Sequence, residues 1–175
     1  DGGMEEAARA VETVVPVFAE CGDEHGLCSA RRLEAWLHWN EAHAAAAAAA
    51  WERAATHASL AGDEHARVGI LTWIASSLYF GPTPVVDAIR RCEEIRDEVS
   101  GDLVWEALTL RHLGGLHAME GRLDVARGLL ATSNAVFDDL GPTLNAAASH
   151  TEAVVELQAG EPAAAERSLR AGYAT

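Results

Sequence analysis

The sequence predicts an all-α fold of antiparallel helix pairs, about 40 residues each, stacked one on another. The tetrapeptide Gly-Asp-Glu-His begins at Gly22 and again at Gly62. Gly-Asp follows at Gly101 and Gly-Pro at Gly141, so the steps are 40, 39 and 40 residues. Alanine is abundant while β-branched and aromatic residues are few, and that composition favours helices. No stretch shows the alternation of apolar and polar residues that is typical of a strand.

Composition and charge limit the kinds of partner and compartment. The chain has 13 basic residues, all of them arginine, against 27 acidic residues, and its formal charge is −14. Because phosphate contacts need a basic stripe, we expect no nucleic-acid partner. The three cysteines (Cys21, Cys28 and Cys92) form no CxxC pair, which is typical of reduced thiols. No apolar run is long enough to span a bilayer and no signal peptide opens the chain, so we expect no membrane partner and a cytoplasmic location.

We expect a single repeat array over the whole chain, 1–175. Residues 5–20 match the second helix of a repeat whose first helix lies before the sequence begins. Pro16 should kink or shorten that helix, because proline removes a backbone donor and clashes with the preceding turn. The four repeats are expected at 22–61, 62–100, 101–140 and 141–175, the last one truncated.

Each repeat breaks near its midpoint into two helices. In the first repeat the break follows Asn40. In the second, the first helix should end at Phe80, after which Thr83 can cap the next helix and Pro84 fits its first position. The third and fourth repeats break at the glycine of Glu-Gly-Arg and of Gly-Glu-Pro, so each repeat is an antiparallel helix pair.

Three columns of residues recur at constant offsets across the repeats. The central column is Ala47, Ala88, Ala126 and Ala165. Twelve residues before these alanines stand Ala35, Ser76, Gly114 and Ala153, and four residues after them stand Trp51, Cys92, Leu130 and Leu169. Small residues at two facing positions let helices approach closely, and the bulkier residue one turn later fills the space between hairpins.

These columns resemble the tetratricopeptide repeat. That pattern has a small residue in the first helix, often glycine at the turn, alanine in the second helix and a bulky residue four positions later. The third repeat matches with Gly114, Gly121, Ala126 and Leu130, and the fourth matches with Ala153, Gly160, Ala165 and Leu169. The first two repeats depart from it, because Ala42 and Thr83 replace the turn glycine, Cys92 replaces the bulky residue, and the period is longer than usual. The resemblance implies a right-handed superhelix, or α-solenoid.

The long period and the Gly-Asp junctions look most like the repeat regions of large bacterial signalling and transcription regulators. In those proteins such repeats accompany an ATPase module, with a nucleotide cyclase or a LuxR-type DNA-binding domain elsewhere in the chain. The resemblance therefore implies a non-catalytic scaffold that binds a protein or peptide or senses an effector, without a cofactor. The alternative is a structural spacer between the ATPase module and the output domain.

Carried over by position, the tetratricopeptide pattern places seven residues on the concave face: Arg32, Trp36, Trp39, Trp73, Phe80, Arg111 and His150. Aromatic and arginine side chains are the types that anchor peptide partners. Because the rest of the protein is acidic, the two arginines favour a partner with an acidic group. Aromatic stripes at helical spacing are also typical of packing, so the tryptophans have two open interpretations, a binding groove or the core between hairpins.

The sequence offers no other site. His38 and His43 are five residues apart, as are His112 and His117, and on one helix that spacing turns two side chains about 140° apart. A zinc-binding helix uses a spacing of four, so we expect no metal site. There is no Gly-x-Ser-x-Gly elbow and no glycine-rich phosphate loop, and we therefore expect no catalytic residues and no enzyme.

Overall fold

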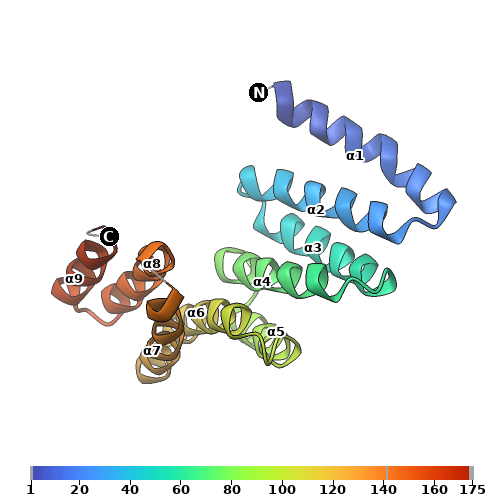
Figure 1. The fold of residues 1–175 in the computed structure, drawn as a ribbon. Coiled ribbons are helices and arrows are strands. Elements are labelled where there is room, and N and C mark those ends of the chain that lie inside the picture. The colour runs from blue at the N-terminus through green and yellow to red at the C-terminus, as the bar shows by residue number, and fades with distance from the viewer. Residues whose placement is uncertain (1, 141, 174–175) are drawn as a thin grey trace. The chain divides into compact units, whose positions relative to one another are not determined.

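The computed structural model describes residues 2–140 and 142–173. For residues 142–148 it describes the backbone alone. Every regular element within these residues is a helix, which confirms the all-α class (Figure 1). The helices are α1 (Gly2–Cys21), α2 (Glu24–Asn40), α3 (Ala44–Leu60), α4 (Glu64–Phe80), α5 (Val85–Glu98), α6 (Leu103–Met119), α7 (Leu123–Leu140), α8 (Pro142–Gln158) and α9 (Pro162–Tyr173). None of them, over the described residues, is both long and apolar enough to cross a bilayer.

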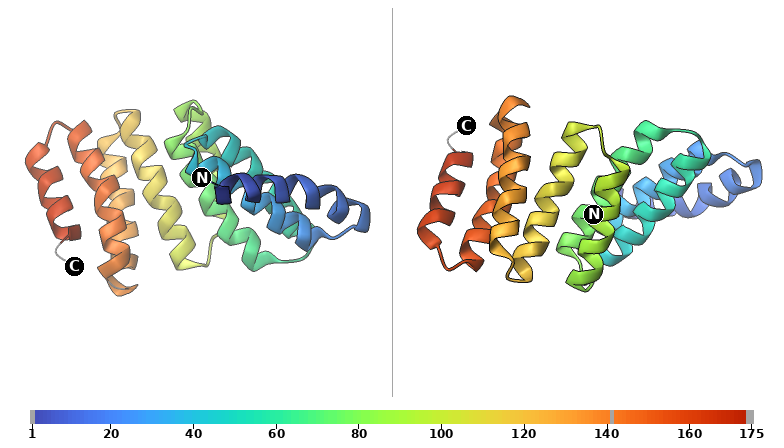
Figure 2. Two further views of the ribbon diagram at one scale, coloured as in Figure 1. Left: turned by 90° about the horizontal axis from the view of Figure 1, so that it is seen from above. Right: turned by 90° about the horizontal axis from the view of Figure 1, so that it is seen from below.

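The helices form two compact units, residues 1–83 and 84–175. In the first unit α2 packs between α1 and α3, and α3 packs on α4 (Figure 1). In the second unit α6 packs against α5, α7 and α8, and α9 runs alongside α8 (Figure 2). The boundary between the units lies inside the segment 62–100, which the repeat pattern groups as one helix pair.

Several helices end in the same turn, which accounts for Gly22 and Gly62 among the recurring glycines. Gly101, with φ of 96°, lies in a different turn, and Gly141 lies outside the described residues. At the end of α3 the N–H of Gly62 donates to the carbonyl of Ser59 (3.0 Å) and that of Asp63 donates to the carbonyl of Ala58 (2.9 Å). This pair of bonds defines the Schellman motif, which needs a residue with positive φ. The same pair of bonds closes the turns at Gly22, Ala42, Gly121 and Gly160. All five of these turn residues have φ between 60° and 78°.

The aspartate after the glycine begins the next helix. Asp23 accepts a hydrogen bond from the N–H of Gly26, Asp63 accepts one from Ala66, and both bonds are 2.9 Å long. Asp102 caps α6 in the same way. These bonds satisfy backbone donors that the first turn of a helix leaves free, so the repeated Gly-Asp pair both ends one helix and starts another.

The expected start of α5 was wrong, and one of the two effects expected of Pro16 is not seen. Pro84 is not the first helical residue and Thr83 is not the cap, because Pro84 itself occupies the N-cap of α5 and makes no side-chain bond there. Nor does Pro16 shorten its helix, since α1 continues to Cys21. Proline has no N–H, so the carbonyl of Glu12 has no donor at Pro16. Both residues are exposed, so water can donate a hydrogen bond to that carbonyl.

The predicted columns lie largely in the core of their units, with Leu169 of the third column half-buried. Ala47, Ala88 and Ala126 have no exposed surface and Ala165 is 2% exposed. In the column twelve residues earlier, three residues are buried and Ser76 is half-buried. A Cβ atom added at Gly114 would lie 3.0 Å from Cγ of Leu130 and 3.2 Å from the carbonyl oxygen of Ala126. Helices α6 and α7 thus approach so closely that only glycine fits without a shift.

Candidate binding surface of the first unit

Five aromatic rings from three consecutive helices meet in the first unit. We call them the aromatic cluster: Trp36 and Trp39 on α2, Trp51 on α3, and Trp73 and Phe80 on α4. The ring of Trp73 is central, with centroid distances of 4.4 Å to Trp36, 5.8 Å to Trp39 and 6.0 Å to Trp51. Trp39 reaches Phe80 at 5.9 Å. Four of the seven residues predicted for the concave face are therefore brought together by direct ring contacts.

Helical spacing explains how the rings gather. Trp36 and Trp39 are three residues apart on α2, while Trp73 and Phe80 are seven apart on α4, and both spacings keep side chains on one helix face. The neighbouring rings meet mostly edge to face, and Trp51 stacks on Trp73 at an interplanar angle of 22°. Such pairs contribute about 0.5–1.5 kcal/mol each beyond the area they bury.

The cluster has a buried base and an accessible edge. Trp51 is 1% exposed, whereas Trp36, Trp39 and Trp73 are half-buried and Phe80 is 57% exposed. These rings pack on one another, as expected for a core between hairpins. They also reach the surface, as expected for a binding groove. Trp51 was predicted as a packing residue of the third column, and the structure shows that it also supports the surface rings.

Arg32 stands one helical turn before Trp36 and is exposed. Residues 32, 36 and 39 share one face of α2 because they are spaced by four and three. Arg32 makes no ion pair with any residue that the structure describes. The other arginines of the first unit, Arg9, Arg31, Arg53 and Arg67, each pair with a glutamate. The guanidinium beside the aromatic cluster therefore has its hydrogen-bond donors available.

The positive charge of Arg32 affects the thiol of Cys28 on the same helix. Cys28 lies one turn earlier, and its burial raises the pKa of the thiol, while the nearby Arg32 acts in the opposite direction. The buried Cys92 of the second unit has its pKa raised to about 12 by the same loss of solvent. Thiols of this kind stay protonated at neutral pH and are poor nucleophiles.

The two remaining predicted site residues belong to the second unit. Arg111 is half-buried on α6 and His150 is exposed on α8. Tyr79 was not predicted, although its ring lies 4.6 Å from that of Phe80. It lies directly before Phe80 on α4, and adjacent helical residues point to different faces.

The two histidine pairs differ in the structure. His112 and His117 both lie within α6, as the spacing argument assumed, and both are buried. Burial and the neighbouring Arg111 lower the pKa of His112 to about 3. For the other pair the assumption of one helix is wrong, because α2 ends at Asn40 and the chain turns back before α3. The rings of His38 and His43 consequently lie with their centroids 6.3 Å apart.

No protein-family model matches the chain, and no curated protein matches it at a significant level.

Proposed function

We propose that the chain is a non-catalytic binding module whose aromatic cluster and Arg32 receive a peptide that carries a carboxylate. The observation that carries the proposal is the position of Arg32. It is an exposed arginine without an ion pair among the described residues, and it lies one helical turn from half-exposed tryptophans in a chain with a formal charge of −14.

Each part of this surface has a distinct role in the proposal. Trp36, Trp39 and Phe80 offer apolar edges for a side chain of the peptide, and aromatic residues of this kind often dominate binding energy. The buried Trp51 packs against Trp36 and Trp73 and restricts their motion, so these side chains lose little conformational entropy when a partner binds. Arg32 can hold a carboxylate through two parallel N–H bonds. The acidic surface elsewhere repels an anionic partner and so favours this place.

We further propose that the chain is a tetratricopeptide-like array, a right-handed superhelix from a larger bacterial regulator. The recurring pairs of helices, the Schellman turns with positive φ and the buried alanine column all support this proposal. In such a protein the peptide would come from a partner that signals to a fused ATPase, cyclase or DNA-binding domain.

A phage-displayed library of random peptides, selected on the purified chain, tests the binding function. We expect a consensus with an aromatic or large aliphatic side chain next to Asp or Glu. Calorimetry with a selected peptide should then show weaker binding to Arg32→Ala and Trp39→Ala, with a loss of about thirtyfold for the tryptophan. Arg9→Ala removes an exposed arginine that pairs with Glu5 and should bind like the parent.

Circular dichroism must show that each variant keeps its helices. Trp105→Ala is the matched control for the tryptophan, since Trp105 is half-buried on α6 in the second unit. If no peptide is selected, or if both site variants bind as the parent does, the proposal fails. The spacer function, in which the rings only stiffen the first unit, would then account for the cluster.

A further inference from the structure

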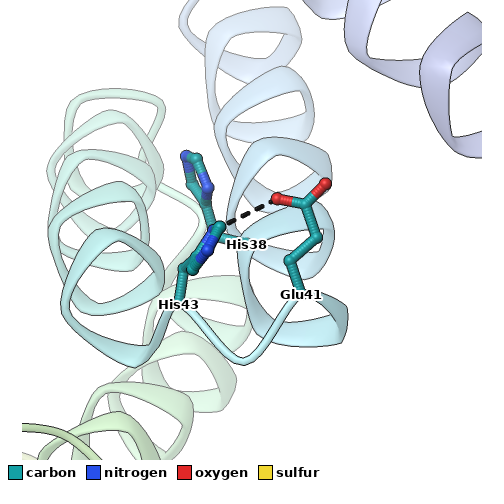
Figure 3. Close-up of side chains that lie close together, drawn as sticks. All are labelled: His38, Glu41 and His43. Carbon is teal, nitrogen blue, oxygen red and sulfur yellow. Dashed lines mark ion pairs between the residues drawn. The ribbon is translucent and has the colours of Figure 1, made fainter.

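The turn between α2 and α3 gathers three side chains that can bind a metal ion. The N–H of His43 donates a hydrogen bond of 2.9 Å to the carbonyl of His38, as the Schellman motif requires. Nδ1 of His43 lies 3.2 Å from Oε2 of Glu41 (Figure 3). One possible ligand atom from each of the three residues lies within 4.8 Å of the other two. The turn, and not a helical spacing, creates this arrangement.

His38 supplies an independent sign that the group is a site. Its Nδ1 atom is buried and has no hydrogen-bond partner among the described residues. Buried polar atoms in native proteins nearly always have a partner, and one that lacks it calls for an explanation such as an ion. Glu41 and His43 are exposed, so both can move toward an ion that binds beside His38.

We propose that His38, Glu41 and His43 bind one divalent transition-metal ion of the Zn²⁺ class. Two imidazoles and one carboxylate form a ligand set that zinc uses in sites with an open fourth position. Zinc lies about 2.0–2.2 Å from such ligands, so neighbouring ligand atoms around a tetrahedral ion are about 3.4 Å apart. The 3.2 Å contact between Glu41 and His43 already fits this distance.

The remaining distances close by side-chain rotation. The side chains of His43 and Glu41 are 63% and 50% exposed, so their rotation meets little steric resistance from neighbours. The proposed ion also replaces the direct contact between them, which is weak in an exposed position. Hard cations such as Mg²⁺ prefer an all-oxygen set, so the two histidines favour zinc, copper or nickel.

The surroundings give the ion an open side. His38 and Glu41 also line a cavity of about 520 Å³ between α1 and α2, whose apolar wall includes Val11, Val15 and Leu37. An ion held at this wall would carry water in its fourth position, or a carboxylate of a molecule in the cavity. The site does not depend on the proposed peptide surface, because none of the three ligands belongs to the aromatic cluster.

Calorimetric titration of the chelator-treated chain with ZnCl₂ tests the proposal. The exposed thiol of Cys21 is first removed by Cys21→Ser, so that it cannot act as a ligand. We expect one Zn²⁺ per chain, and a loss in affinity of about tenfold or more for each of His43→Gln and Glu41→Gln. Both residues are exposed, so these variants should fold.

His57→Gln is the matched control. His57 lies 2.7 Å from Glu24, so this pair has a histidine and a carboxylate like the proposed site but lacks the second histidine. It should bind Zn²⁺ as the Cys21→Ser parent does. Co²⁺ gives a second readout, since an intense visible absorption band shows a tetrahedral ion and should disappear in His43→Gln. Failure to bind Zn²⁺, or equal affinities for the parent, His43→Gln and Glu41→Gln, would overturn the proposal.

Discussion

The hydroxyl of Ser133 on α7 donates a buried hydrogen bond of 2.7 Å to the carbonyl oxygen of Ala107 on α6. It ties the two helices of a hairpin together where neither side chain is exposed. Ser133→Ala should lower the free energy of unfolding by about 1 kcal/mol, because a net hydrogen bond is lost. Urea denaturation measures this. Thr132→Ala is the control, since exposed Thr132 bonds only to its own helix at Gly128 and should change stability little.

Overpacking tests the alanine column. Ala126 has no exposed surface and lies against Gly114, where even one added carbon would be too close. Ala126→Leu should therefore lower the free energy of unfolding by about 1–3 kcal/mol. Val125→Leu enlarges a neighbour that is 46% exposed and should be close to neutral. Equal stabilities for the two variants would show that α6 and α7 do not pack through this column.

The turn at Ala42 should become more stable with glycine. Ala42 has φ of 60°, a conformation that costs an L-residue roughly 1–2 kcal/mol, while glycine occupies it freely. After the greater freedom of glycine in the unfolded chain is included, Ala42→Gly should raise the free energy of unfolding by about 0.5–1 kcal/mol. Gly121→Ala is the reverse experiment. An added Cβ meets nothing within 4 Å there, so only the backbone opposes it, and stability should fall by about 1 kcal/mol.

Stability should also fall in mild acid because of His112. Burial lowers its pKa to about 3 in the folded chain, against 6.5 for an ordinary histidine. Between these values the unfolded chain binds a proton that the folded chain does not, so each pH unit downward can cost up to about 1.4 kcal/mol. The pKa of His117 is lowered too, mainly by burial, so His117 also makes stability fall as the pH falls.

Urea denaturation at pH 7 and pH 5 measures this effect. His112→Gln should show a smaller loss of stability between the two values than the parent, whatever its stability at pH 7. His65→Gln replaces an exposed histidine on α4 and should leave the loss unchanged. A loss of the same size in His112→Gln would contradict the assignment.

Most helix boundaries could be predicted because the signals are local. Glycine with positive φ and aspartate as N-cap act within a few residues, and the repeated Gly-Asp pair records both functions. The behaviour of Pro16 could not be predicted, since it depends on whether water reaches the carbonyl of Glu12. Pro84 was misplaced by one residue, which is the usual uncertainty of a helix end.

The candidate sites were predictable to different degrees. Trp36, Trp39, Trp73 and Phe80 were assigned to one face by carrying the tetratricopeptide pattern over by position. The availability of Arg32 could not be read from the sequence, because it depends on which glutamates the other arginines contact in three dimensions. The meeting of His38 and His43 was missed for a related reason, since it required knowing that the chain turns at Ala42.

The aromatic cluster makes the first unit optically distinct. Four of the five tryptophans, Trp36, Trp39, Trp51 and Trp73, lie in that unit, and only Trp105 lies in the second. Intrinsic fluorescence therefore reports chiefly on residues 1–83, whereas the far-ultraviolet signal of helices reports on both units. Repeat arrays can lose their units separately when the coupling between them is weak. If the chain unfolds cooperatively, the denaturation curves recorded by the two signals coincide. If the two units unfold separately, the curves differ, and no added label is needed to see this.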